Sequence, residues 1–378
     1  MRKTPTILVG IVLLLLALGI VMLASASSVK GNAVYKDSNY FLIRQLLWLA
    51  VAVVAGGVTY SVDYHRWQRW WVPISIFAGL FLFLVLVPHV GVKINGSHRW
   101  IRFGSFSTQP SEFAKFALVI MLSSWMATRK GREATFKEGI LKPGLMLIPI
   151  LGLVFMEPDF GTTVLLAVVG GAILFVGGSP VRYLGMGVFA GVVLFAVAVM
   201  HDPVRAGRIM AFLEPEKCPA AAYHLQQSEQ AFTLGGVWGV GLGESLQKHF
   251  YLPEAHTDFI LAIIGEELGL AATVMVVGLF AGFLFCGTLI ASKAPDRLGR
   301  LMAMGFTLMI TVQATINIGV VTGCLPTKGL ALPFISYGGS SLIVCMMCVG
   351  ALVNIARQAV VTEERAVIRA VQDKGRWL

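Results

Sequence analysis

Charged residues are scarce in this chain of 378 residues. They make up 13% of it, against about 25% in ordinary soluble domains. The chain also lacks a P-loop, a dinucleotide-binding fingerprint, an H-E-x-x-H motif and a cluster of metal-ligand cysteines, so a cytoplasmic ATPase or a nucleic-acid-binding protein is unsupported. Of its five cysteines, Cys345 and Cys348 form a C-x-x-C inside an apolar run, where we interpret them as packing residues rather than a redox pair.

Hydrophobic residues, in contrast, make up 56% of the chain, which is typical of an integral membrane protein. A helix needs about 20 apolar residues to cross the hydrocarbon core of a bilayer. Runs of this kind predict an all-α polytopic membrane protein with about ten transmembrane helices. The expected spans are 7–26, 41–61, 71–90, 112–127, 144–157, 160–177, 182–200, 260–290, 301–323 and 334–356.

The loops predict the orientation, because Lys and Arg favour the cytoplasmic side of a membrane. They are more frequent on the side of the N-terminus, so we expect both termini in the cytoplasm and a large extracytoplasmic loop at about 201–257. Residues 1–28 resemble a signal peptide, but their apolar run exceeds the roughly 7–15 residues usual there, so we expect a retained first span. We expect one transmembrane domain, 1–357, in the bacterial inner membrane, followed by a cytoplasmic tail, 358–378.

Unusual polar residues lie mostly on the expected outer side, and the first patch is 95–115. There Trp100 lies among arginines that include Arg102, as in an aromatic belt at headgroup level. A helix is predicted to start just before Glu112, whose side chain shares a face with Lys115 and can pair with it. Two interpretations of this lysine stay open. It is a structural ion pair inside the bundle, or it faces a polar cavity and touches an anionic substrate.

The second patch is the loop at 201–257, which carries Arg205, Arg208 and a glycine-rich run, "LGGVWGVGLG". Glycine allows the backbone to approach a ligand closely. The run is too flexible for a stable packed domain, and a long loop of this kind is usually either functional or disordered.

The third patch, 326–341, lies between the last two expected spans. Lys328 and Ser336 lie there among further serines and glycines. Irregular backbone at membrane depth is tolerated where it is buried or lines a cavity. The patch therefore predicts a re-entrant turn whose amides and lysine can hold an anion.

Four carboxylates precede or begin the eighth span, in "YLPEAHTDFILAIIGEELG". On an unbroken helix Asp258 and Glu266 would be about 12 Å apart along the axis, beyond the roughly 5–9.5 Å of paired-carboxylate glycosidases. We therefore interpret Glu266 and Glu267 as structural, hydrogen-bonded to neighbouring helices or cations. Asp258, beside His256 and facing basic loops, fits a general base opposite an anionic leaving group.

Four ordered motifs resemble the SEDS family of bacterial cell-wall polymerases: "GSHRWIRFGSFSTQPSEFAK", "PDFGTT", "YLPEAHTDFILAIIGEELG" and "LPTKGLALPFISYGGSS". The resemblance covers Leu23 to Arg357 and is nearest to the FtsW (division) branch, with RodA as a near relative. It implies a ten-helix enzyme that polymerises lipid II at the outer face of the inner membrane. It also implies a partner, a single-span class B penicillin-binding protein that crosslinks the strands, and other divisome membrane proteins.

The resemblance places the family's essential aspartate on Asp258. It implies an inverting glycosyl transfer in which Asp258, assisted by His256, deprotonates the acceptor 4-hydroxyl and undecaprenyl pyrophosphate leaves. Basic residues would stabilise the pyrophosphate; no metal ligand is predicted, and a need for Mg²⁺ or Mn²⁺ stays open. The candidate substrate-binding residues are Trp100, Arg102, Glu112, Lys115, Arg205, Arg208, Lys248, His256, Lys328 and Ser336.

Two alternatives remain at this point. A lipid II flippase or other transporter would explain charges within spans. However, a transporter places its site near the midplane between inverted repeats, whereas the polar residues here lie towards the outer face. A non-catalytic scaffold that activates a partner synthase is the second alternative.

Overall fold

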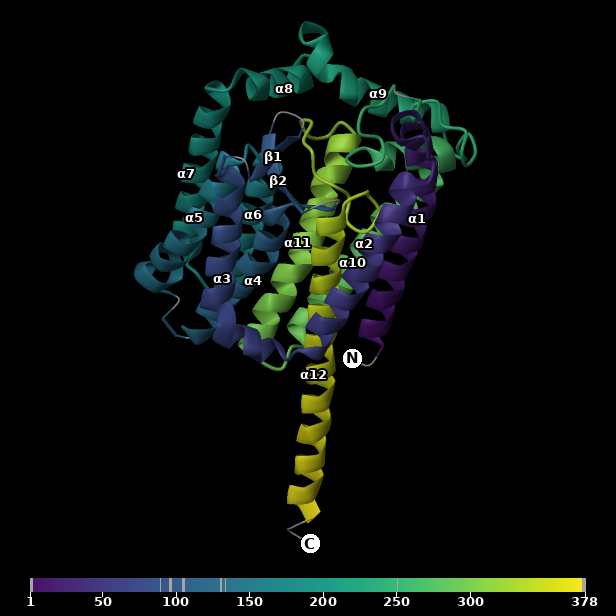
Figure 1. Cartoon of the computed structure of the whole chain (residues 1–378). Coiled ribbons are helices and arrows are strands. Elements are labelled where there is room, and N and C mark those ends of the chain that lie inside the picture. Colours follow the sequence, from purple (N-terminus) through teal and green to yellow (C-terminus); the bar gives the residue numbers. More distant parts are fainter. Residues whose placement is uncertain are drawn as a thin grey trace.

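The computed structural model describes residues 3–375 except 89, 95–96, 104–105, 130, 133 and 250. The side chains of 93–94, 97–98, 103, 106, 203–205, 221 and 366–375 are also outside the described part. Long helices run side by side in a bundle (Figure 1). The elements are α1 (Thr4–Tyr35), α2 (Tyr40–Ser61), α3 (Tyr64–Leu86), β1 (Gly91–Ile94), β2 (Ser97–Phe103), β3 (Phe106–Thr108), α4 (Pro110–Thr128), the π-helix η1 (Lys137–Leu141), α5 (Lys142–Met156), α6 (Phe160–Val176), α7 (Val181–Met200), α8 (Pro203–Leu213), the 3₁₀-helix η2 (Pro215–Lys217), α9 (Pro219–Gly235), α10 (Ile260–Ser292), α11 (Arg297–Val321) and α12 (Gly339–Gly375).

The fold is that of an all-α polytopic membrane protein, and every predicted span coincides with a helix. The number ten is not confirmed. Within the described residues, eight helical segments are long and apolar enough to cross a membrane. The helix α6 is apolar but has 17 residues, and α4, which carries Glu112 and Lys115, is not among the eight.

The helices pack closely where small residues meet. A Cβ at Gly350 in α12 would lie 2.2 Å from the carbonyl oxygen of Gly56 in α2. Such backbone approach is typical of membrane helix pairs. The helix α4 is buried on nearly all sides inside the bundle.

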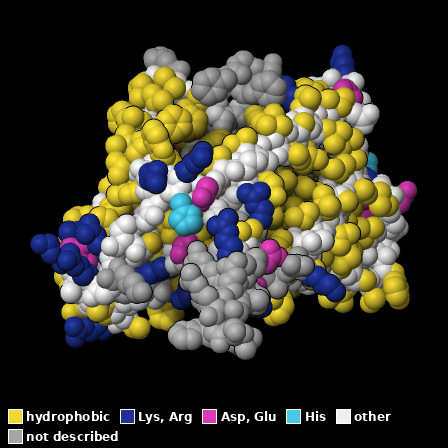
Figure 2. Space-filling model, turned by 90° about the horizontal axis from the view of Figure 1, so that it is seen from below, with side chains coloured by type: hydrophobic (Ala, Val, Ile, Leu, Met, Phe, Trp, Pro, Cys, Tyr) yellow, Lys and Arg dark blue, Asp and Glu magenta, His cyan; other side chains and the backbone are white. Residues whose placement is uncertain are grey.

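The two ends of the bundle differ in character. In Figure 1, α8 and α9 lie across the upper end, whereas both chain ends lie towards the lower end. Figure 2 views the lower end and shows Lys and Arg side chains gathered there. Arg66 and Arg69 near the start of α3, Lys293 just after α10 and Arg300 near the start of α11 are exposed on this side. The distribution agrees with the predicted charge asymmetry of the loops.

A three-stranded antiparallel sheet between α3 and α4 was not predicted. Its order is β1-β2-β3, with Val92 opposite Trp100 and Ile101 opposite Thr108. The strands are too short to give an alternating pattern that stands out beside the long apolar runs. The sheet carries the first polar patch into the helix α4.

The expected large loop is more ordered than its composition predicted. Residues 203–235 form α8, η2 and α9, and Pro219 takes an early position of α9, where its missing N–H leaves no hydrogen bond unmade. The sequence analysis did not predict these helices, and the flexibility it expected concerned the glycine-rich run 234–243, which begins where α9 ends. In Figure 1, α8 and α9 lie across the end of the bundle.

The helix α10 is broken at Gly269, where φ is 76° and ψ is −174°. The glycine-rich segment of the loop fills the break. The amide of Val240 donates to the carbonyl of Glu266 at 2.9 Å, and the amide of Leu270 donates to the carbonyl of Gly236 at 3.0 Å. The backbone groups freed by the break are thereby satisfied, as they must be near membrane depth.

Candidate functional site

Asp258 lies in a tight turn that ends just before α10 begins at Ile260. The turn is closed by the amides of Thr257 and Phe259, which donate to the carbonyl of Glu254 at 3.1 and 3.3 Å. Asp258 therefore precedes the helix that carries Glu266, and the distance estimated for an unbroken helix does not apply to this pair. The aspartate is held by a turn at the end of the bundle that α8 and α9 cover.

The loop before α12 forms a second side of the site. The Ser336 hydroxyl donates to the carbonyl of Thr257 at 2.5 Å, and the Tyr337 amide donates to the carbonyl of His256 at 3.0 Å. Gly329 lies against the aspartate, since a Cβ there would be 2.8 Å from Asp258 Oδ2. Ser336 thus pins the loop to the turn, and the glycine allows the carboxylate to approach.

A third side comes from residues that the sequence analysis did not select. Arg99 in β2 donates from Nε to the carbonyl of Glu157 at 3.0 Å. Asp159 begins α6, where its Oδ1 accepts the Thr162 amide at 3.2 Å, and its Oδ2 accepts from Gln109 Nε2 at 3.1 Å. The signal was present in the sequence, since Asp159 belongs to the "PDFGTT" motif and Arg99 to "GSHRWIRFGSFSTQPSEFAK", but neither residue was selected for the site.

The charged groups around Asp258 shift its pKa in opposite directions. Burial and the nearby carboxylates of Glu254 and Asp159 raise the pKa of Asp258 to about 7, although Arg99 and Arg208 act in the opposite direction. An unperturbed aspartate has a pKa of about 3.9. Asp258 can therefore exchange a proton near neutral pH, as a general base must.

His256 is buried with its ring between aromatic rings. The ring centroids of Phe41 and Tyr337 are 4.8 and 5.9 Å from it. Burial and the charge of Lys30 lower the pKa of His256 to about 4, although Glu254 acts to raise it. The imidazole is accordingly neutral at pH 7.

One of the predicted cations, Arg208, acts on Asp258, and a second, Lys328, interacts with the charge of Asp159. Arg208 in α8 contributes to the field at the aspartate. Lys328 is half-buried, with its Nζ 5.2 Å from the centre of the Phe195 ring in α7. Burial lowers the pKa of Lys328, although Asp159 acts to raise it.

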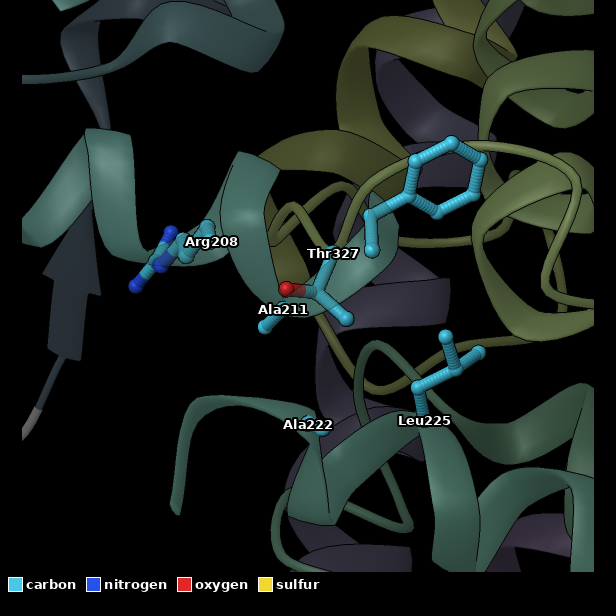
Figure 3. Close-up of a pocket in the computed structure, with 6 residues that line it drawn as sticks. Arg208, Ala211, Ala222, Leu225 and Thr327 are labelled. Carbon is cyan, nitrogen blue, oxygen red and sulfur yellow. The ribbon is translucent and has the colours of Figure 1, made fainter. Parts of the chain in front are cut away.

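A shallow depression that is open to solvent lies between α8, α9 and the loop before α12. In Figure 3, Leu225 and Thr327 line it, and Arg208 points away from both. The guanidinium is therefore directed out of this pocket.

Lys115 and Lys248 are enclosed in networks of their own. The Nζ of Lys115 donates to Glu112 Oε1 and to Gln313 Oε1, each at 2.7 Å. The predicted pairing with Glu112 is confirmed, in a buried position. The Nζ of Lys248 is 3.2 Å from Glu267 Oε1, whose carboxylate also accepts from the Ser25 hydroxyl in α1 at 2.6 Å.

The structural role predicted for the two glutamates of α10 is confirmed. Glu267 belongs to the lysine network just described, and Glu266 accepts the amides of Leu246 and Gln247 at 2.9 and 3.4 Å. Both carboxylates are buried. They fasten the loop to α10 and do not face Asp258.

The remaining candidates lie at the sheet and on α8. Trp100 is half-exposed and Arg102 exposed in β2, and the charge of Arg102 acts on Tyr40, whereas Arg99 lies at a register shift of the β1–β2 pair. Arg205 lies in α8, but its side chain is outside the described residues. Among the described residues, no group of three or more His, Cys, Asp or Glu side chains is placed to hold a metal ion.

Known proteins resemble this chain over nearly its whole length. A protein of Trichlorobacter lovleyi named "Probable peptidoglycan glycosyltransferase FtsW" is 43% identical over 352 residues, 93% of this chain and 92% of that protein. Stage V sporulation protein E of Bacillus subtilis is 40% identical, over 94% of this chain and 98% of that protein.

Solved structures show a similarity that also extends over nearly the whole chain. A chain of a peptidoglycan synthase complex that coordinates polymerization and crosslinking has a TM-score of 0.76 at 28% identity, covering 93% of this chain and 97% of that chain. The rod shape determining protein RodA of Thermus thermophilus has a TM-score of 0.69 at 28% identity, over 93% and 95%. The family model of FtsW, RodA and SpoVE matches residues 5–360. The chain therefore belongs to the FtsW/RodA/SpoVE family of cell cycle proteins.

Proposed function

We propose that this chain is a peptidoglycan glycosyltransferase that polymerises lipid II into glycan strands during septal cell-wall synthesis. The names of its FtsW relatives support the reaction and the division role. One observation carries the assignment: the Asp258 carboxyl group, with a pKa of about 7, lies in the turn before α10 where the charges of Arg99 and Arg208 act on it. A base near neutrality opposite cations suits a reaction that deprotonates a hydroxyl and expels an anion.

In the proposed reaction, the Asp258 carboxylate takes the proton of the acceptor sugar's 4-hydroxyl. That oxygen forms a bond to the anomeric carbon of the lipid-linked donor. The bond from the anomeric carbon to the pyrophosphate oxygen breaks, with inversion, and undecaprenyl pyrophosphate leaves with the bonding electrons. Neutral His256 packs beside the turn and maintains its shape rather than sharing the proton.

The leaving pyrophosphate needs positive charge that is already in place. We assign this role to Arg99 and Arg208, whose charges act on Asp258, and to Lys328, which precedes the Gly329 that lies against the Asp258 carboxylate. A divalent cation, Mg²⁺ or Mn²⁺, would enter bound to the pyrophosphate, since Mg²⁺ is commonly held through substrate phosphates with few protein ligands. Lys115 and Lys248, which are enclosed by protein partners, would support the site from within.

The membrane arrangement follows from the same proposal. The end with α8 and α9 faces outward in the inner membrane, and both termini lie in the cytoplasm, in keeping with the exposed arginines at the lower end. Residues 1–357 form one transmembrane domain, and α12 continues without a break into the tail at 358–378.

Because a related structure is a peptidoglycan synthase complex, we propose that the chain works with a single-span class B penicillin-binding protein and other divisome membrane proteins. The polar groups gather near the end of the bundle, where a transporter would need them near the midplane. This position favours the enzyme over a flippase.

The experiment uses purified protein with fluorescent lipid II in liposomes, with and without the partner. Wild type should make polymer, and Asp258→Asn should lose about 10²–10⁴ in rate. Asp258→Asn at the wild-type rate would refute the assignment of the base. Transfer of lipid II across the bilayer without any polymer would favour the flippase.

A further inference from the structure

The side chain of Asn317, near the outer end of α11, lies beneath the two segments that build the site. It is buried. Its Nδ2 donates one hydrogen bond to the carbonyl of Asp258 and one to the carbonyl of Leu330, each at 2.7 Å. One amide group therefore joins the turn that carries the carboxylate to the loop that packs against it.

These two hydrogen bonds connect the turn and the loop at the point nearest to the Asp258 carboxylate. The other ties between turn and loop, from Ser336 and Tyr337, reach Thr257 and His256. Leu330 directly follows Gly329, which lies against Asp258 Oδ2. Without Asn317, the turn and the loop would be fastened only on the side away from the reacting group.

The chemistry of the amide fits this task. A primary amide has two N–H donors on one nitrogen, and here both are directed at carbonyl oxygens. The opposite orientation would place Oδ1 against those oxygens. Among the residues that the structure describes, Oδ1 itself has no donor, an arrangement with an energetic cost. An apolar side chain at this position would remove the unpaired Oδ1 but would leave the carbonyls of Asp258 and Leu330 without the donor that they have here.

A neighbouring residue on α11 extends the same support. Gln313, one turn earlier, donates from Nε2 to the carbonyl of Ala331 at 2.8 Å and accepts from Lys115. Consecutive carbonyls of the loop, at Leu330 and Ala331, are therefore held by consecutive turns of one helix. The buried Lys115 and Glu112 pair connects this support to α4.

We propose that Asn317 is a positioning residue for the glycosyl transfer, fixing the backbone at Asp258 and Leu330 so that the carboxylate meets the acceptor hydroxyl. This rests on the function proposed above. Asn317 touches no reacting atom and acts through the backbone. Its loss should lower kcat much more than it alters KM, because orientation is lost while the binding surfaces remain. Misplacement by about 1 Å costs roughly 10²-fold in rate, and we expect a kcat loss of this order.

The test compares Asn317→Leu, which removes both donors, with Asn317→Gln, which restores an amide on a longer stem. The matched control is Asn354→Leu. Asn354 is also buried and donates to a backbone carbonyl, that of Tyr60, but it lies on α12 near the opposite end. Each protein is measured in liposomes with lipid II, and its thermal unfolding is recorded in detergent.

We expect Asn317→Leu to lose about 10² in kcat, Asn317→Gln to recover part of it, and Asn354→Leu to retain wild-type kcat. A second readout is the pH profile. A loosened turn admits water to Asp258, so the acid limb of kcat/KM should move to lower pH. Reduced folding alone lowers the whole profile without moving it. The groups that face Asp258 in this titration are Glu254, Asp159, Arg99 and Arg208.

A folded Asn317→Leu protein with wild-type kcat and an unmoved profile would overturn the proposal. If that variant does not fold, Asn317→Ser, whose short hydroxyl cannot reach both carbonyls, decides it by the same measures. Asp258→Asn is assayed in parallel. Full activity of Asp258→Asn would overturn the proposed function itself, whereas an inactive Asp258→Asn with a fully active Asn317→Leu would overturn the positioning role alone.

Discussion

The pH dependence of polymerisation gives the sharpest prediction, because the pKa of Asp258 lies near 7. A base acts in its ionised form. With that pKa it is about half ionised at pH 7 and roughly one-eleventh ionised at pH 6, so the rate should fall about fivefold over this unit and about tenfold for each unit below. An aspartate with its ordinary pKa of about 3.9 would give a flat profile over the same range.

Two substitutions should move this profile in opposite directions. Glu254→Gln removes a charge that raises the pKa of Asp258, so the acid limb should move to lower pH. Arg208→Gln removes a charge that lowers the pKa, so the limb should move to higher pH. The measurement is kcat/KM with fluorescent lipid II from pH 5 to 8 at constant ionic strength. A flat profile in the wild type, or shifts of the same sign in both variants, would refute the reasoning.

Further predictions concern packing, a buried ion pair and a cation. Gly239→Ala places a Cβ 2.2 Å from a carbonyl oxygen of α10 at a φ of 80° and should destabilise by about 2 kcal/mol or more. The control Gly278→Ala, in the interior of α10 with nothing within 4 Å, should not lower the melting temperature. Lys115→Met leaves the Glu112 carboxylate buried without its cation and should lower the free energy of unfolding by about 3–5 kcal/mol. Adding Glu112→Gln to this variant should restore most of the melting temperature. A double variant that melts no higher than Lys115→Met would contradict this account. Lys328→Met should lower kcat/KM about 10²-fold without lowering the melting temperature. A wild-type kcat/KM in this variant would disprove the role assigned to Lys328.

The long helices could be predicted because membrane spans depend on length and hydropathy, which are local properties. The sheet at 91–108 could not, because a strand of three or four residues is stable only through its pairing. The helices α8 and α9 were missed for a similar reason. The helix α9 packs against α10, and such a contact between distant segments is not visible in the sequence of 203–235.

Site residues could be predicted where they stand out within one segment of the sequence. They could not be predicted where the site is formed by several elements that come together only in the fold. Asp258 and Lys328 stand out as polar residues in short irregular segments. Arg99 and Arg102 are equivalent in the sequence, and only the fold decides which of their charges acts on Asp258. Asn317 could not be identified from the sequence, because its role depends on the two backbone carbonyls that its amide contacts in the fold.

The way in which the loop closes the break of α10 at Gly269 allows the side chains of the closing segment to vary. The loop is attached there through backbone groups, so the attachment depends on glycines and not on the identity of the side chains between them. Val237 and Trp238 project outward, exposed by 55% and 86%. These positions can therefore change in size and polarity without loosening the join, and one lineage can present a surface there that differs from its relatives' while the core of the molecule stays the same.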